Sequence, residues 1–218
     1  MTLRLVLEDG PWRVEAAGEA GDVLVLAFAS IGHDAARMPS AEFVGQLRGR
    51  RALFVMDAAR SWGTGAGFAD VLRQVVGAAG PVRRIVALGS SMGAVAALRA
   101  CGVVPVDAVL ALGPQSGADG RWPMAGVDVP DLPACWTVLC HGMADDAVQA
   151  GGWPVRAGVD HLLFGGVGHS ALALHLKARG GLQGMVDALC DGDRRRLLRI
   201  AGQAGAVQRR RVPRPMEG

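Results

Sequence analysis

Short runs of apolar residues recur along the chain and constrain its fold more than any other feature. A run that is apolar throughout, rather than at every second residue, is typical of a strand buried on both faces of a parallel sheet. Six such runs occur: Val23–Phe28, Ala52–Met56, Arg84–Leu88, Ala108–Leu112, Trp136–Cys140 and His161–Phe164. Two shorter segments, Leu3–Leu7 and Trp12–Ala16, flank a Gly-Pro turn and predict a hairpin at the start. The sequence therefore predicts a mostly parallel sheet of about eight strands.

Helical patterns lie between these runs. In Phe68–Ala78 the apolar residues recur with the period of one helix face. Further helices are expected at Ala41–Leu47, Met92–Ala100, Ser170–Arg179 and Leu182–Leu189. Strands that alternate with helices predict a three-layer α/β/α sandwich. A chain of 218 residues suits one domain, which we expect over residues 1–205, with a disordered basic tail at 206–218.

The composition disfavours several function classes. The chain has no tyrosine, and Lys177 is its one lysine among 23 basic residues. A phosphate-binding P-loop needs a lysine directly after its glycine, whereas here Ala94 follows Gly93. A Tyr-x-x-x-Lys dehydrogenase pair is also impossible. A dinucleotide-binding protein therefore remains only a weak alternative.

Charge and hydropathy indicate where the protein works. The net charge is +3, and the arginines gather late in the chain without interleaved aromatic residues, which disfavours nucleic acid as a partner. No apolar run could span a bilayer, and the first residues do not resemble a signal peptide, so we expect a cytoplasmic protein that binds no membrane. The four cysteines lack metal-ligand spacing, so we expect free thiols and no metal. The sequence does not indicate an oligomeric state.

The segment Gly89–Gly93, GSSMG, fits the pattern G-x-S-x-G between a predicted strand and a predicted helix. In that pattern Ser91 stands at the tip of a sharp turn, and the N–H of Met92 faces the reacting carbonyl oxygen. Ser90 is a weaker candidate because it is not centred between the glycines. A plain helix cap or turn would also explain the segment, so Ser91 needs partners.

An acid and a histidine follow at the ends of later strands. Asp145 and Asp146 come shortly after Trp136–Cys140, and His169 comes shortly after His161–Phe164. Parallel strands end at one edge of a sheet, so these side chains can converge on Ser91. A serine hydroxyl becomes a nucleophile when a histidine oriented by a carboxylate accepts its proton.

With these motifs, from about Leu3 to Arg179, the chain resembles the α/β-hydrolase family. The resemblance implies that Asp145 is the catalytic acid, with Asp146 as the fallback, beside Ser91 and His169. It also implies a second oxyanion donor after the third strand, at Ser30 or Ile31. Such enzymes need no metal and no other cofactor for this chemistry.

We also expect a substrate pocket near this edge, lined by His33, Arg60 and Trp62. The segment Gly113–Pro133 is too short for a large cap, which predicts an open site. The favoured function is a serine hydrolase that cleaves ester-type bonds in a small-molecule or other acylated substrate. The alternatives are a serine acyltransferase, a deacetylase acting on a glycan, and a non-catalytic interaction protein with the same fold.

Overall fold

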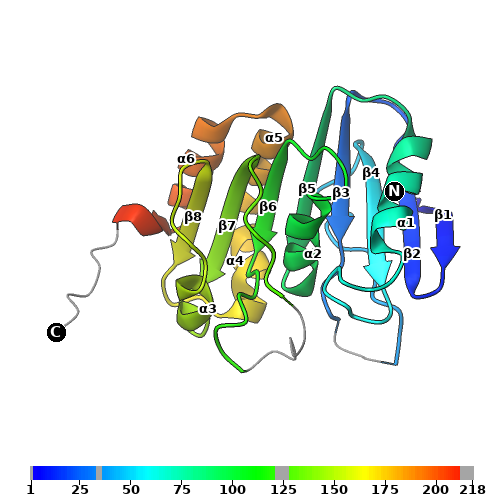
Figure 1. Ribbon diagram of the computed structural model, residues 1–218. Helices are drawn as coiled ribbons and strands as arrows, with labels where there is room; N and C mark the ends of the chain where they lie inside the picture. Colours follow the sequence, from blue (N-terminus) through cyan, green and yellow to red (C-terminus); the bar gives the residue numbers. More distant parts are fainter. Residues whose placement is uncertain (1, 33–35, 121–127, 212–218) are drawn as a thin grey trace.

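The computed structural model describes residues 2–32, 36–120 and 128–211. These residues form one sheet of nine strands in the order β1-β2-β4-β3-β5-β6-β7-β8-β9 (Figure 1). The strands are β1 Arg4–Asp9, β2 Trp12–Ala17, β3 Val23–Phe28, β4 Arg51–Asp57, β5 Arg84–Ser90, β6 Ala108–Leu112, β7 Trp136–Gly142, β8 Val159–Phe164 and β9 Ala206–Gln208. Strands β4, β3, β5, β6, β7 and β8 are parallel neighbours, whereas β1, β2 and β9 join antiparallel. The prediction of a mostly parallel sheet is confirmed.

Helices cover both faces of this sheet and complete the three layers (Figure 1). Helices α1 Phe68–Ala79 and α2 Met92–Ala100 lie on one face, and α4 Leu172–Ala178, α5 Gly181–Asp191 and α6 Arg194–Gln203 lie on the other. Helix α3 Ala147–Gly151 and the one-turn segments η1 His169–Ala171 and η2 Arg209–Arg211 are short. None of the helices in the described residues is long and apolar enough to cross a membrane.

Strand β3 shows why the apolar runs are continuous. Leu24, Leu26 and Phe28 pack into the core cluster beneath α1 and α2. Val25 and Ala27, on the opposite side of the same strand, pack into the cluster beneath α4, α5 and α6. Because both sides of the strand are dry, neither carries the polar residues of a half-exposed sheet.

The structure corrects two predictions about secondary structure. The predicted helix Ala41–Leu47 is not formed: the chain turns only from Val44 onward, and Phe43 has a φ of 61°, which a regular helix does not allow. The buried side chains of Phe43 and Leu47 explain the helix-like spacing of apolar residues. The predicted disordered tail begins with an ordered strand, since Ala206–Gln208 pairs with β8. Residues 212–218 lie outside the described residues.

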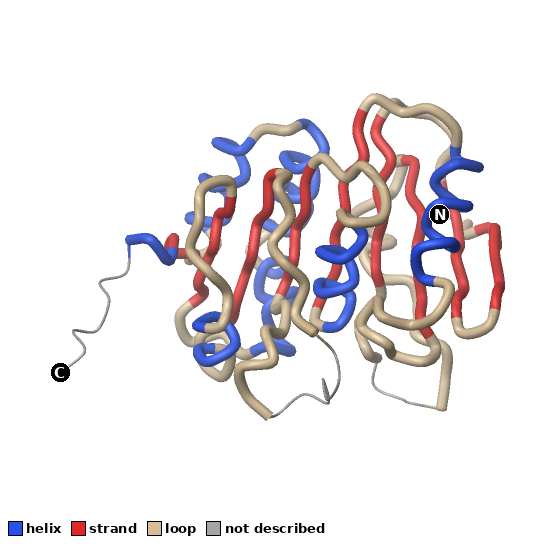
Figure 2. The backbone as a smooth tube through the Cα atoms, viewed as in Figure 1, coloured by secondary structure: helices blue, strands red, loops and turns tan. Residues whose placement is uncertain are grey.

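The loops that follow the parallel strands gather at one edge of the sheet (Figure 2). At this edge β5 leads to Ser91, β7 leads to Asp145 and Asp146, and β8 leads to His169. The sheet therefore brings together the residues expected to be catalytic.

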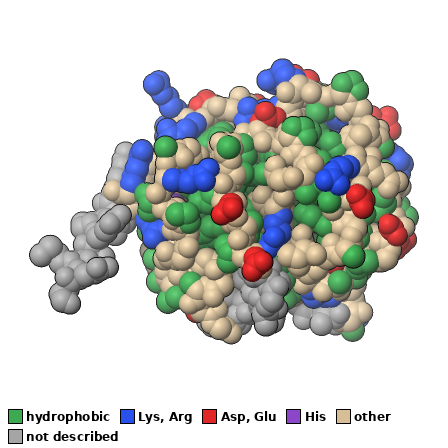
Figure 3. Space-filling model, in the orientation of Figure 1, with side chains coloured by type: hydrophobic (Ala, Val, Ile, Leu, Met, Phe, Trp, Pro, Cys, Tyr) green, Lys and Arg blue, Asp and Glu red, His purple; other side chains and the backbone are tan. Residues whose placement is uncertain are grey.

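Away from the edge, Lys and Arg side chains occupy several separate places on the face shown, with acidic side chains between them (Figure 3).

Candidate active site

Ser91 stands at a sharp turn between β5 and α2. Its φ and ψ are 55° and −122°, a strained conformation for a residue with a side chain. The turn is held from β6, because the Ser91 N–H donates to the carbonyl of Leu112 at 2.8 Å. A Cβ atom at Gly89 would lie 2.2 Å from the carbonyl oxygen of Gly93, and one at Gly93 would lie 2.3 Å from that of Phe28. Only glycine fits at both positions, which is what the sequence pattern requires.

His169 connects Ser91 to a buried carboxylate. Its Nε2 atom lies 3.0 Å from Ser91 Oγ, and its Nδ1 atom lies 2.7 Å from Asp146 Oδ2. Asp146 is 1% exposed. A carboxylate only accepts hydrogen bonds, so Nδ1 carries the proton and Nε2 is left to accept one from the serine hydroxyl. This is the tautomer that a general base needs.

The expected place of Asp145 is therefore corrected. Its exposed carboxylate accepts a hydrogen bond from the backbone N–H of His169 at 2.6 Å, and Asp146 faces the imidazole ring instead. The cause is the tight turn after β7, in which the Asp146 N–H donates to the carbonyl of Gly142 and its own carbonyl accepts from Ala150. Consecutive side chains in such a turn point in different directions. Both aspartates thus fix His169, one through its backbone and the other through its ring.

The candidate oxyanion donors differ in availability. Met92 is the first residue of α2, and the first N–H groups of a helix have no acceptor within it. The Ser30 N–H, in contrast, donates to the carboxylate of Glu42 at 3.1 Å. Ile31 remains, and its carbonyl accepts a hydrogen bond from Arg60 Nε at 2.9 Å, which restrains the loop on the C-terminal side of the Ile31 N–H. The geometry therefore favours Met92 and Ile31 over Ser30.

The three expected pocket residues have different surroundings. Arg60 donates to the carbonyl oxygens of Ile31, Ala58 and Arg37, so its guanidinium braces the loops at this edge. Trp62 is 2% exposed and packs in a small cluster with Met92 and Val95, directly behind the nucleophile turn. His33 lies outside the described residues. A substrate contact of Arg60 or Trp62 stays a prediction.

Gln115, in the loop after β6, is a site residue that the sequence did not reveal. Its Nε2 atom lies 2.9 Å from Ser91 Oγ and 3.1 Å from His169 Nε2, and the residue is fully buried. Ser91 itself is 8% exposed, and the side chain of His169 is 7% exposed. The expectation of an open site stays a prediction.

A chain of hydrogen bonds supports the loop that carries Gln115. His141 Nε2 lies 2.9 Å from the carbonyl oxygen of Pro114, His141 Nδ1 lies 2.9 Å from His161 Nε2, and Arg209 Nη1 lies 3.3 Å from His161 Nδ1. Since a guanidinium only donates and a carbonyl only accepts, each donor must point the same way, from Arg209 through both histidines to Pro114. Both rings are then neutral.

The pKa values of these histidines agree with neutral rings. Burial lowers the pKa of His141 from 6.5 to about 4 and that of His161 from 6.5 to about 2. Arg209 and the neighbouring histidines lower both pKa values further, whereas the Pro114 carbonyl and Asp146 act in the opposite direction on His141. His141 and His161 are therefore structural supports and do not exchange protons with Ser91.

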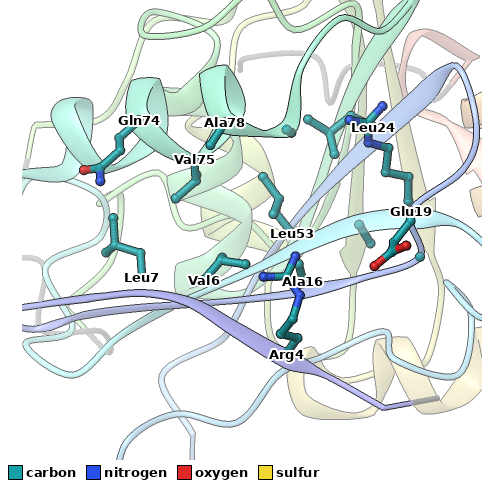
Figure 4. Close-up of a pocket in the computed structure, with 14 residues that line it drawn as sticks. Arg4, Val6, Leu7, Ala16, Glu19, Leu24, Leu53, Gln74, Val75 and Ala78 are labelled. Atoms are coloured by element: carbon teal, nitrogen blue, oxygen red, sulfur yellow. The ribbon is translucent and has the colours of Figure 1, made fainter.

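A cavity of about 410 Å³ is lined in part by Val6, Leu7 and Val75 (Figure 4). It opens between β1, β2 and the end of α1, next to Leu24 and Leu53 near the beginnings of β3 and β4. Ser91 follows the end of β5, which runs parallel to β3, so the length of the sheet separates the two places. This cavity has no part in the catalytic geometry.

The arrangement of sheet, helices and nucleophile turn is the α/β-hydrolase fold, and comparisons with solved structures agree. No protein-family model and no curated protein sequence matches the chain. A capsule O-acetyltransferase of Neisseria meningitidis serogroup A superposes with a TM-score of 0.61 at 12% identity, over 84% of this chain and 93% of that one. An esterase of Pyrococcus furiosus superposes with a TM-score of 0.57 at 14% identity, over 83% and 86%. A serine hydrolase without a lid from Xanthomonas campestris gives 0.50 at 18% identity, over 81% and 94%.

Proposed function

We propose that this protein is a serine hydrolase that cleaves ester bonds, with Ser91 as nucleophile, His169 as general base and Asp146 as the carboxylate that orients it. The observation that carries the proposal is the continuous set of contacts from Asp146 Oδ2 through His169 to Ser91 Oγ, at 2.7 and 3.0 Å. The strained conformation of Ser91 supports it, because such strain is found where a side chain must be presented to a substrate.

The proposed reaction has two halves. Ser91 Oγ attacks the ester carbon while His169 Nε2 takes its proton, and the negative oxygen is held by the N–H groups of Met92 and Ile31. Collapse breaks the bond to the alcohol, which leaves with the proton from His169. Water then attacks the acyl-serine while His169 Nε2 takes one of its protons, and collapse breaks the bond to Ser91 Oγ, which takes that proton back from His169 as the acid is released. Asp146 stabilises the positive imidazole in both halves.

A fluorophosphonate probe tests the nucleophile directly. We expect the wild-type protein to be labelled and the Ser91→Ala variant to remain unlabelled, with p-nitrophenyl esters of short acids hydrolysed only by the wild type. The matched control is Ser61→Ala, since the Ser61 hydroxyl donates to Asp57 and is none of the proposed catalytic groups. Equal labelling of wild type and Ser91→Ala would disprove the assignment of Ser91.

Acyl transfer is the second candidate function. It would use the same residues, with an alcohol in place of water as acceptor in the second half. The fold likeness to a capsule O-acetyltransferase supports it, although the same likeness extends to esterases. Product analysis with and without an added polyol separates the two functions, because a transferase makes a new ester whereas a hydrolase releases only free acid.

A further inference from the structure

Gln115 occupies a position that the proposed reaction needs for another atom. The alcohol oxygen that leaves, and the water or alcohol oxygen that later attacks, must lie within hydrogen-bond distance of His169 Nε2 and next to Ser91 Oγ. Gln115 Nε2 stands there now, at 3.1 and 2.9 Å from these two atoms. Two atoms cannot share the place, so the carboxamide must move when a substrate binds.

The Gln115 carboxamide has a defined orientation, and its oxygen atom lacks a hydrogen-bond donor. Ser91 Oγ accepts a hydrogen bond from Gln115 Nε2, and the unprotonated His169 Nε2, which is an acceptor, lies 3.1 Å from the same atom, so the NH₂ end faces both groups. Its Oε1 atom is buried and has no hydrogen-bond partner in the described part of the chain. A buried carbonyl without a donor is unfavourable, and a substrate that brings a donor would relieve it.

The backbone on both sides of Gln115 is fixed, so the side chain is the part that can yield. The Pro114 carbonyl accepts from both His141 Nε2 and Trp153 Nε1, at 2.9 and 3.0 Å. On the other side, the Ser116 N–H and hydroxyl both donate to Gln149 Oε1, at 2.5 and 3.1 Å. A rotated Gln115 side chain would therefore remain beside the alcohol part of the bound ester.

We propose that Gln115 determines specificity by selecting esters whose alcohol part carries a second hydroxyl next to the ester oxygen, as in vicinal diols and sugars. This inference rests on the proposed function. A displaced carboxamide needs both an acceptor for its N–H groups and a donor for Oε1, and one hydroxyl supplies both. A plain alkyl alcohol supplies neither and leaves these groups unpaired. Sites built to pair with a substrate hydroxyl discriminate strongly against analogues that lack it.

A pair of esters of equal size tests the proposal. Using the acid whose p-nitrophenyl ester the wild-type protein cleaves fastest, kcat/KM is measured for its ethylene glycol monoester and its propyl ester. We expect the wild type to prefer the glycol ester by about tenfold or more. In Gln115→Met, which keeps the length of the side chain but not its hydrogen bonds, the ratio should fall to about one through loss on the glycol ester. Gln115→Ala should give the same ratio, and it serves if the Met variant does not fold.

Controls separate this inference from the proposed function. Gln183 is exposed and lies on α5, so Gln183→Ala should keep the wild-type preference. A wild-type protein that fluorophosphonate does not label contradicts the proposed function itself. A labelled wild type that cleaves both esters equally well overturns only the role of Gln115, as does a preference that survives in both Gln115 variants.

Discussion

The nucleophile turn and the loop after β7 both deliver a side chain to the same edge of the sheet, but their backbones constrain it to different degrees. At the turn, Gly89 and Gly93 admit no Cβ atom, so the path of the chain and the position of Ser91 follow from the sequence pattern. In the loop after β7, two adjacent aspartates are chemically equal, and one tight turn decides which of them faces His169. A sequence pattern therefore predicts the position of a side chain only where it allows the backbone a single path.

The largest expected effect tests the choice between the two aspartates. Asp146→Asn should reduce kcat about 10,000-fold, because the amide can hold the wrong imidazole tautomer and no longer stabilises its charged form. Asp145→Asn should reduce kcat by less than about tenfold, since it loses only charge at a backbone contact. Steady-state ester hydrolysis measures both. The reverse order of the two variants would restore Asp145 as the catalytic acid.

The next effect concerns the pair of buried histidines, His141 and His161, that supports the loop carrying Gln115. The folded-state pKa values of His141 and His161 lie below the ordinary value of 6.5, so their contribution to stability is complete above about pH 6.5 and declines as the pH falls towards 4. Below about pH 6.5, each histidine should lower the free energy of unfolding by about 1.4 kcal/mol per pH unit. For both histidines together, the decrease between pH 7 and pH 5 should be about 4 kcal/mol.

Urea unfolding at pH 7, 6 and 5 measures this decline. His161→Gln keeps a side-chain donor but removes one titrating ring, so its stability should fall with about half the wild-type slope. A wild-type free energy of unfolding that stays constant over this range would show that the histidines are not held neutral.

The third effect tests the backbone of the nucleophile turn. Gly93→Ala should lower the free energy of unfolding by about 3 kcal/mol, because the new methyl group meets the Phe28 carbonyl. The matched control is Gly77→Ala in the exposed last turn of α1, where a Cβ meets nothing within 4 Å. The control should gain up to about 1 kcal/mol from improved helix propensity. Chemical denaturation compares the two, and equal stabilities would mean that the turn tolerates a side chain.

The smallest effect concerns the loop after β3. Arg60→Gln removes the guanidinium that holds the Ile31 carbonyl and so restrains the loop next to the Ile31 N–H, so kcat should fall about tenfold while the melting temperature changes little. A variant that loses stability without losing kcat would show that Arg60 supports the fold rather than the oxyanion site.

Much of the fold could be predicted because buried strands leave a simple pattern of apolar residues in the sequence. The six apolar runs coincide with β3 to β8, since a strand covered on both faces has no place for polar residues. Strand β9 could not be found in this way. Ala206–Gln208 is short and has only intermediate or exposed side chains, and it becomes a strand because the edge of β8 offers hydrogen bonds.

The site, too, contains residues that the sequence pattern predicts and residues that it does not. Ser91 and His169 could be predicted because each comes shortly after a strand that the pattern locates. Gln115 could not, because a glutamine in a segment rich in Gly, Pro and Asp has no periodic signal and acquires its role only through contacts with residues 24 and 54 positions away. The sequence indicates Asp146 only as the second choice, because the family resemblance points to the first aspartate of the motif. The turn after β7 instead directs the side chain of the second aspartate towards the His169 ring.

The hydrogen-bond chain from Arg209 to Pro114 has a consequence for how the protein is made. Arg209 follows β9, the last strand of the sheet. It also donates to the carbonyls of Ala150 and Trp153, which come shortly after Asp146 in the chain. Pro114, Ala150 and Trp153 are thus held by a residue that the ribosome adds much later than any of them. A nascent chain released or stalled before that arginine would have the nucleophile turn but lack the support beneath its partners, so synthesis itself delays the moment at which the site is complete.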